Sequence, residues 1–290
     1  MKKKMVYNPW FLLPALLIYS LLFIAPVVLN FGYSLTNWNA IKLSGDVAKF
    51  IGFENFRKIF SDPELLAVVT RTIGFAAVTT VLKNILGFML ALLLNKGLKS
   101  AAALRAVFFL PSMLSPLIIG LMFGSLLMTN GFFNHLLTGI GLGDLTRPWL
   151  TTASTAMGSV IFVDVWKQVG FNMVIYRAGR QLIDSTLYEA ASIDGANARH
   201  QLVRITIPRM IPSIIINLLL NMSGGLKTFD IVFALTGGGP NGNTELINNA
   251  VFKQYGQKLY GLSAAYGVIV FLITAFFGLL ILNIKDDVDS

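Results

Sequence analysis

The sequence predicts an all-α, polytopic membrane protein in which six transmembrane helices form one domain over residues 1–290. Of the 290 residues, 55% are hydrophobic and only 13% are charged, and the mean hydropathy is +0.69. An average soluble domain carries about 25% charged residues, so this chain has too few charges to cover a water-exposed surface. Cysteine is absent, which excludes disulfides, thiolate metal ligands and a cysteine nucleophile.

Six apolar stretches are long enough to cross the hydrocarbon core of a bilayer, which takes roughly 20 helical residues. They cover residues 10–35, 67–95, 106–128, 152–176, 210–235 and 262–283. The first stretch follows Lys2, Lys3 and Lys4, as the apolar part of a signal peptide would. It is too long for a signal peptide, contains Pro14 and Pro26, and lacks a clear small-x-small cleavage site. We therefore expect an uncleaved first span.

The distribution of basic residues predicts that both termini are cytoplasmic. An even number of spans places the termini on one side, and the cytoplasmic assignment puts 12 of the 23 Lys and Arg residues inside and 8 outside. The short loop between the second and third spans is basic and has no acidic residue, in agreement with the positive-inside rule. Membrane orientation then explains the net charge of +9, so we expect a lipid bilayer and no nucleic acid as a partner.

Two connections between spans are long. Residues 36–66 form a polar outer segment with turn or cap signals at Asn55, Ser61 and Asp62, which predicts one or two short surface helices. Residues 177–208 form a cytoplasmic segment with a helical, amphipathic pattern. Because uncommonly long loops often carry function, we expect a functional role for the second segment.

A short helix is predicted inside this cytoplasmic segment. Thr186 and Glu189 have the S/T-x-x-E spacing of a capping box, and Asp184 is a second residue able to cap the helix start. Gly195 can adopt a positive φ and end the helix.

The surface of this helix predicts a protein partner. An apolar patch of large and small side chains is formed by Leu187, Tyr188, Ala190 and Ala191. A helix resting on lipid headgroups is the alternative, but such helices carry larger apolar residues and more Lys or Arg. The acidic Glu189 and Asp194 instead favour a basic groove on a protein.

One sequence motif spans this helix and the residues after it. Glu189-Ala190-Ala191 is followed by three residues and Gly195, then by nine residues and Ile205-x-Ile207-Pro208. This order resembles the EAA loop of binding-protein-dependent ABC importer permeases, whose pattern is EAA-x3-G-x9-I-x-L-P. The one departure is Ile207 in place of Leu, which keeps the bulk of the side chain. Asp194-Gly195-Ala196 is also similar to the DGA of that family.

A second resemblance narrows the subfamily. The stretch Leu235–Pro240 reads LTGGGP and is soon followed by Thr244-Glu245. It is similar to the LTGGGP…TE stretch of carbohydrate permeases of the maltose and glycerol-3-phosphate type. The segment WFLLP at residues 10–14 and Asn55-Phe56 ahead of the second span fit the same subfamily.

The resemblance implies a function and a set of partners. The chain would be a transmembrane subunit of an ATP-binding-cassette importer that moves a sugar or oligosaccharide into the cytoplasm by alternating access. Its partners would be a second homologous permease, two ABC ATPase subunits and an extracytoplasmic solute-binding protein, in a bacterial or archaeal plasma membrane. The ATPases would bind ATP and Mg, and this chain would hold no cofactor and no metal. The absence of a G-x-x-x-x-G-K-[ST] motif agrees with this division of labour.

The resemblance also implies a docking site for an ATPase. Glu189 would be a charged contact, Gly195 the turn, and the apolar patch the inserted knob. The ATPase-coupling residues are then Leu187, Tyr188, Glu189, Ala190, Ala191, Asp194 and Gly195.

Polar residues inside the fourth and fifth spans mark a candidate substrate path. An ionisable residue at mid-bilayer costs about 2.5–3.5 kcal/mol on insertion scales, so it usually faces the bundle interior. Asp164 and Lys167 lie one helical turn apart and are expected to pair with each other, whereas Lys83 has no partner that the sequence identifies. The candidate path residues are Asp164, Trp166, Lys167, Asn217, Asn221, Gly224, Thr228 and Lys227.

Two interpretations of this polar set stay open. Asn217, Asn221, Gly224 and Thr228 recur on one helical stripe. Such residues either join helices by hydrogen bonds and close packing or line a path for sugar hydroxyls. Trp166 is placed among the path residues because its ring could stack on a sugar.

Three other functions are alternatives to a sugar importer. An ABC permease for another small solute stays open, as does an ion-coupled secondary transporter that would use Asp164 as its coupling carboxylate. The second gives no reason for the EAA pattern. A membrane-embedded enzyme is disfavoured because the spans contain no spaced carboxylate pair, His cluster or Ser/His set.

Overall fold

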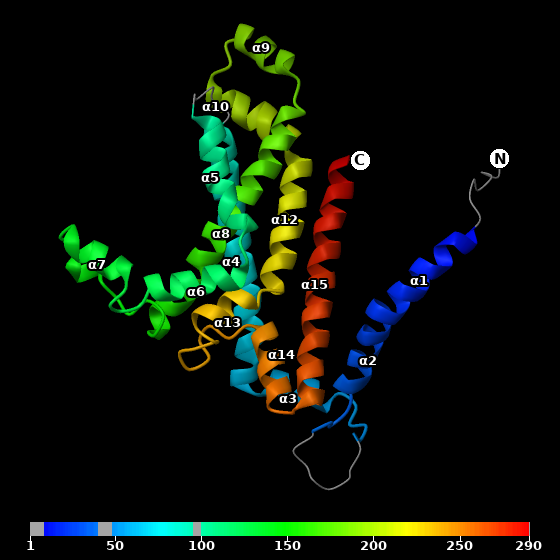
Figure 1. Ribbon diagram of the computed structural model, residues 1–290. Helices are drawn as coiled ribbons and strands as arrows, with labels where there is room; N and C mark the ends of the chain where they lie inside the picture. Colours follow the sequence, from blue (N-terminus) through cyan, green and yellow to red (C-terminus); the bar gives the residue numbers. More distant parts are fainter. Residues whose placement is uncertain (1–8, 40–47, 95–99, 290) are drawn as a thin grey trace. The chain divides into compact units, whose positions relative to one another are not determined.

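The computed structural model describes residues 9–39, 48–94 and 100–289 (Figure 1). Within these ranges the chain is helical and contains no β-strand, so the predicted all-α class is confirmed. The residues Lys2, Lys3, Lys4, Lys96 and Lys99, which support the predicted orientation, lie outside the described ranges. The cytoplasmic placement of the termini therefore stays a prediction.

The chain divides into two compact units, each built from two stretches of sequence. The first unit comprises Met1–Leu66 and Ala250–Ile269, and the second comprises Ala67–Asn249 and Val270–Ser290. The single domain expected from the sequence stays a prediction.

The first unit begins with a long apolar helix and a loop fixed by one asparagine. The helix consists of η1 (Pro9–Leu12), α1 (Leu13–Tyr19), the π-helical turn η2 (Ser20–Ile24) and α2 (Ala25–Ser34). After it comes the predicted surface helix, α3 (Glu54–Ser61). The buried amide of Asn55 donates hydrogen bonds to the carbonyls of Ser34 (2.8 Å) and Thr36 (2.9 Å), so this side chain fastens α3 to the end of α2.

The second unit is built around the long helix α8 (Ala153–Gln181), which packs on α5, α6, α12 and α13. Its other elements are α4 (Pro63–Leu93), α5 (Ala101–Met113), α6 (Pro116–Leu126), α7 (Phe132–Gly139), η3 (Gly143–Leu145), α9 (Ser185–Ile193), α10 (Ala198–Gln201), η4 (Leu202–Thr206), α11 (Ile207–Arg209), α12 (Ile211–Leu226) and α13 (Asp230–Leu235). The chain ends with α14 (Ile247–Gly256) and α15 (Tyr260–Asp289).

Three of the predicted spans are single helices in the structure. Trp10–Ser34, Pro63–Leu93 and Tyr260–Asn283 are each long and apolar enough to cross a membrane. They correspond to the first, second and sixth predicted spans. The fourth predicted span corresponds to α8, which has 29 residues but is less apolar than these three helices. The count of six spans stays a prediction.

The third and fifth predicted spans are broken in the structure and are not single helices. The third is a pair, α5 and α6, bent by 101°. Pro116 opens α6, and the residue before a proline is driven out of the helical region; Ser115 accordingly has an extended backbone, with ψ 133°. The fifth ends early, because α12 stops at Leu226 and α13 begins at Asp230. A second bent pair, at 64°, joins Ala198–Arg209 to Ile211–Leu226.

Glycine allows α5 and α8 to approach closely. A Cβ atom on Gly170 would lie 1.8 Å from the carbonyl oxygen of Phe108, so no other residue fits there without a backbone shift. Small residues at helix contacts are typical of membrane proteins, where close packing replaces the hydrophobic driving force.

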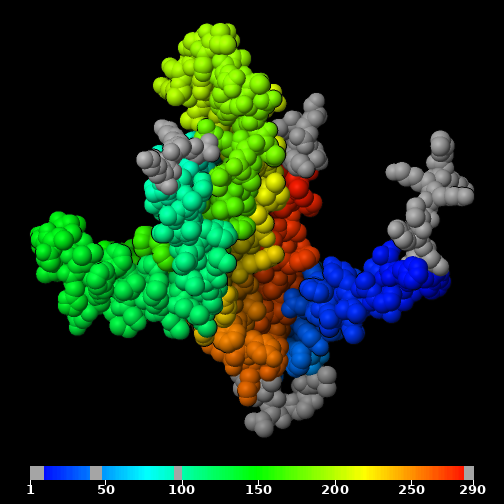
Figure 2. Space-filling view, turned by 45° about the horizontal axis from the view of Figure 1, so that its top comes forward, coloured from blue at the N-terminus to red at the C-terminus, as the bar shows by residue number. Residues whose placement is uncertain are grey.

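One short helix projects from the second unit. In Figure 1, α9 lies beyond the ends of α5, α8 and α12, and Figure 2 shows it as a lobe that stands clear of the packed helices. None of its residues is buried.

Candidate functional sites: a projecting helix and a polar cavity

The helix α9 (Ser185–Ile193) is present where the sequence predicts it, but its cap differs. The carboxylate of Asp184 accepts a hydrogen bond from the backbone N–H of Thr186 (3.0 Å), so Asp184 is the N-cap and not Thr186. This backbone hydrogen bond, together with one from the side chain of Thr186, lowers the pKa of the Asp184 carboxyl. Both donors favour the ionised form, so the capping group is a carboxylate at neutral pH.

The other end of α9 confirms the predicted glycine turn. Gly195 has a φ of +76°, and nothing lies within 4 Å of the position of a Cβ atom there. The backbone N–H of Ala196 then reaches back to the carbonyl of Ala191 (2.8 Å). This is the usual way in which a left-handed residue satisfies the last carbonyls of a helix. Gly195 is therefore needed for its backbone conformation and not for lack of space.

The predicted coupling residues divide between two faces of α9. Leu187, Glu189 and Ala190 are exposed, as are Asp194 and Gly195 beyond its end. Tyr188 and Ala191 are half-buried. The structure thus brings the seven residues together but does not present them all outward.

Tyr188 faces its own chain. Its hydroxyl lies 2.9 Å from the hydroxyl of Thr206, a buried residue of the π-helical turn η4. A second contact runs beside it, because the amide of Gln201 donates to the hydroxyl of Ser192 (3.0 Å). The expected knob of apolar side chains therefore lacks Tyr188 in this structure.

Two apolar residues that the sequence analysis missed border α9. Leu182, three residues ahead of α9, is 88% exposed, and Ile193, the last residue of the helix, is 87% exposed. Ile193 directly precedes the motif residue Asp194, and Leu182 lies two residues before the cap Asp184. A large apolar side chain so close to a motif residue or a cap is the sequence signal that could have found them. Together with Leu187, they are the large exposed apolar side chains in and just before this helix.

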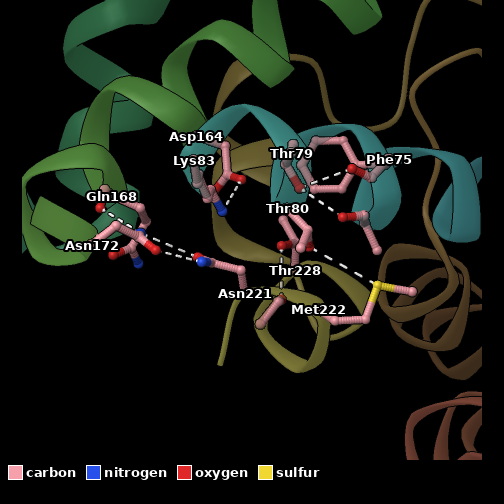
Figure 3. A network of polar contacts seen from close by, with 12 residues as sticks. Phe75, Thr79, Thr80, Lys83, Asp164, Gln168, Asn172, Asn221, Met222 and Thr228 are labelled. Atoms are coloured by element: carbon pink, nitrogen blue, oxygen red, sulfur yellow. Dashed lines mark hydrogen bonds and ion pairs between the residues drawn. The ribbon is translucent and has the colours of Figure 1, made fainter. Parts of the chain in front are cut away.

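The polar cavity begins with an ion pair between helices. The ammonium group of Lys83 on α4 lies 2.5 Å from a carboxylate oxygen of Asp164 on α8, and both side chains are buried (Figure 3). The expected pair of Asp164 with Lys167 is therefore wrong. Residues one turn apart on a helix compete with residues of a neighbouring helix, and here the packing of α4 against α8 brings Lys83 closer.

Asparagine side chains join α8 to α12. Asn172 and Asn221 form a reciprocal pair, in which the amide of each donates to the side-chain oxygen of the other (Figure 3). Asn221 also donates to the backbone carbonyl of Asn217 (2.8 Å). For Asn221, helix-to-helix hydrogen bonding is thus the arrangement observed. In the same unit, the hydroxyl of Tyr176 donates to the side chain of Asn84.

A cavity of about 340 Å³ lies beside these contacts, between α4, α8, α12 and the start of α13. Six of the eight predicted path residues line it, namely Asp164, Lys167, Asn221, Gly224, Thr228 and Lys227. Lys83, Gln168 and Asp230 also line it. The predicted helical stripe is interrupted, because α12 ends at Leu226 and Thr228 lies in the connection to α13.

Two predicted path residues do not reach this cavity. The ring of Trp166 packs edge-on against Phe123, with 5.0 Å between the centroids, and belongs to the apolar core of the unit. Asn217 is fully buried within α12. The sequence periodicity placed both residues on the correct helices but could not assign the face of Trp166.

The LTGGGP stretch forms a closed turn at the end of α13. The hydroxyls of Thr236 and Thr244 lie 2.7 Å apart, and Thr244 donates to the carbonyl of Gly239 (2.6 Å). A larger cavity of about 800 Å³ lies between this turn and α6. This cavity cannot be read from the sequence, because it depends on the bend that places α6 beside α13.

Comparison with known proteins identifies the family. The model of the family described as "Binding-protein-dependent transport system inner membrane component" matches residues 83–289. The probable ABC transporter permease protein YurN of Bacillus subtilis (strain 168) is 34% identical over 268 residues, which are 91% of this chain and 90% of that protein. The trehalose/maltose transport system permease protein MalF of Thermococcus litoralis is 33% identical, over 94% of this chain and 91% of that protein.

Solved structures show the same fold. A chain of a bacterial ABC transporter involved in the import of the acidic polysaccharide alginate superposes with a TM-score of 0.82, at 22% identity and over 97% of each chain. At 22% identity, this superposition shows that the two chains share a fold. The family match and the two relatives show that this chain belongs to the inner membrane components of binding-protein-dependent transport systems, the permease subunits of ABC importers.

Proposed function

We propose that this chain is one of two permease subunits of a sugar importer and that it moves a saccharide into the cytoplasm by alternating access. Family membership supports a multi-pass, non-catalytic transport subunit. The names of its relatives support a saccharide, since they include a trehalose/maltose permease and a multiple sugar-binding permease of Streptococcus mutans at 32% identity. The remaining partners are two ATPase subunits, which hold ATP and Mg, and an extracytoplasmic solute-binding protein.

The observation that carries the proposal is the connection from α9 to the cavity. The exposed face of α9, with Leu187 and Glu189, offers a docking surface for an ATPase. Its other face is joined by Tyr188 to Thr206, and the chain continues from there through α11 into α12, which lines the polar cavity. Closure of the ATPases on ATP would then move α9 and, through this connection, the wall of the cavity.

The docking surface is tested by reversing one charge. In the complete importer in proteoliposomes, we expect Glu189→Lys to lower substrate-stimulated ATP hydrolysis at least tenfold, while the protein still inserts and the ATPases keep their basal rate. The control is Glu64→Lys, the same change at an exposed residue in the first turn of α4. Normal stimulated hydrolysis in Glu189→Lys would exclude the docking role of α9.

The transport mode and the orientation have their own tests. Uptake that requires ATP and the binding protein supports an ABC importer, whereas uptake that persists without ATP would support an ion-coupled transporter. Because the chain has no cysteine, Ile193→Cys creates a single labelling site beside the docking surface. A membrane-impermeant maleimide should label it in inverted vesicles and not in intact cells.

A further inference from the structure

Lys167 is a buried cation on the wall of the polar cavity. It lies near the middle of α8, is 5% exposed and lines the cavity of about 340 Å³. Among the described residues, its ammonium group has no hydrogen bond and no carboxylate within ion-pair distance. Burying a charge is unfavourable unless another group pairs with it, so this ammonium needs a partner.

Among the described residues, Asp164 and Asp230 attract the Lys167 ammonium group, but neither lies within ion-pair distance of it. Asp164, one turn away on the same helix, is held by Lys83 at 2.5 Å. Lys227 and Asp230 are exposed residues three positions apart, on either side of the break between α12 and α13. The cavity wall therefore carries three cations and two anions, and the surplus positive charge is buried at Lys167.

We infer that Lys167 binds an anionic group of the transported saccharide, such as the carboxylate of a uronic acid or a phosphate. This inference rests on the proposed function and names the substrate class of the same cavity. The cargo anion would supply the counter-charge that the chain does not, and charge-assisted hydrogen bonds of this kind are stronger than neutral ones. The cavity volume is within the range of about 300–1,000 Å³ for small-molecule sites.

The groups around Lys167 suit the rest of a saccharide. Gln168, Asn221 and Thr228 line the same cavity and bear amide or hydroxyl groups that can bond to sugar hydroxyls. The Lys83–Asp164 pair has a separate effect, because the direct ion pair of Asp164 is made with Lys83 and not with Lys167. Because Asp164 pairs with Lys83, Lys167 remains the cation that would select an anionic substrate.

The experiment compares two saccharides that differ in one charge. The complete importer in proteoliposomes, with its binding protein, is given a glucuronate-terminated disaccharide and the same disaccharide with its carboxyl group reduced to an alcohol. The concentrations are chosen so that the binding protein is saturated with either. We expect faster uptake of the acidic disaccharide by the wild type. A disaccharide phosphate as a third substrate tells whether the anion is a carboxylate or a phosphate.

Variants of Lys167 locate the effect. Lys167→Gln should lower uptake of the acidic disaccharide at least tenfold and change uptake of the neutral one by less than twofold, and Lys167→Arg should retain most of the acidic uptake. Lys253→Gln, an exposed lysine that does not line the cavity, is the matched control. Should Lys167→Gln fail to assemble, equal uptake of both disaccharides by the wild type, or loss of the acidic preference in Lys167→Arg, would still overturn the anion site.

The outcomes separate this inference from the proposed function. Equal uptake of both disaccharides by the wild type, or an equal loss of both in Lys167→Gln, would overturn the anion site and leave a sugar importer. Absence of ATP-dependent uptake of any saccharide would instead overturn the proposed function.

Discussion

The hydroxyls of Tyr188 and Thr206 lie 2.9 Å apart and tie the projecting helix α9 to the π-helical turn η4. Thr206 is buried and Tyr188 half-buried, so the contact lies on the inner side of α9. The neighbouring contact of Gln201 with Ser192 supports the same side of the helix. The inner side of α9 is thereby tied to the stretch of chain that leads through α11 into α12.

Removal of this contact should weaken coupling without unfolding the protein. A neutral hydrogen bond contributes about 0.5–1.5 kcal/mol, so we expect Tyr188→Phe to lower substrate-stimulated ATP hydrolysis by roughly two- to tenfold. Thr206→Val should have a similar effect, and the double variant should be no worse than either single one, because residues in one contact are not additive. Tyr255→Phe, at an exposed tyrosine, is the control. Additive losses would show that the two hydroxyls act separately.

The buried ion pair of Lys83 and Asp164 predicts a strong dependence of each residue on the other. Removing one partner of a buried pair costs about 3–5 kcal/mol, because it leaves an uncompensated charge. We expect Lys83→Met and Asp164→Leu each to lower the thermal unfolding temperature of the detergent-solubilised complex markedly. The double variant should recover most of that loss. Were its loss the sum of the single losses, the two side chains would not be a pair.

The contact of Gly170 with α5 predicts a severe effect of one methyl group. Gly170→Ala places a Cβ atom 1.8 Å from the carbonyl oxygen of Phe108, and overpacking of this kind costs about 1–3 kcal/mol or more. We expect a lower unfolding temperature and less assembled complex. Gly158→Ala, on the same helix with nothing within 4 Å, is the matched control and should change stability by less than about 0.5 kcal/mol. Equal effects of the two substitutions would contradict the close approach of α5 and α8.

The cap of α9 predicts a defined dependence on pH and on residue type. Because hydrogen bonds from Thr186 lower the pKa of Asp184, the stabilisation is present above the ordinary pKa of an aspartate and is lost only as the pH falls through the lowered value. Stimulated ATP hydrolysis should therefore not report titration of this residue between pH 6 and 8. Asp184→Asn should keep the cap and most of the activity, whereas Asp184→Ala should reduce both. A similar loss in Asp184→Asn would mean that the charge, and not the cap, is required.

The sequence predicted most of the helices and the short helix α9, because these depend on local signals. The length of the apolar run at residues 67–95 corresponds to α4, and Asp184 and Gly195 bound α9 as caps do. Pro116 is a local sequence signal for the bend between α5 and α6, but the length of the apolar stretch alone predicts one continuous span. A proline can thus break a stretch whose apolar length alone predicts one continuous span.

The residue contacts of the cavity could not be predicted in the same way. Asp164 has one lysine three residues away and another 81 residues away, and sequence spacing favoured the nearer, Lys167. Only the packing of α4 on α8 brings Lys83 to it. Trp166 likewise lies on a predicted helix, but its neighbour Phe123 comes from α6.

By itself, the sequence determined that this chain is an all-α membrane protein with an EAA helix, because hydrophobic length, helix caps and a motif are properties of contiguous residues. Tertiary structure decided that Tyr188 faces inward and that Asp164 pairs with Lys83. It also decided that Lys167 is buried with no carboxylate of the described residues within ion-pair distance. These outcomes depend on which helix faces meet. The meeting of faces is set by packing between segments far apart in the chain, at positions such as Gly170 where only a missing side chain permits contact.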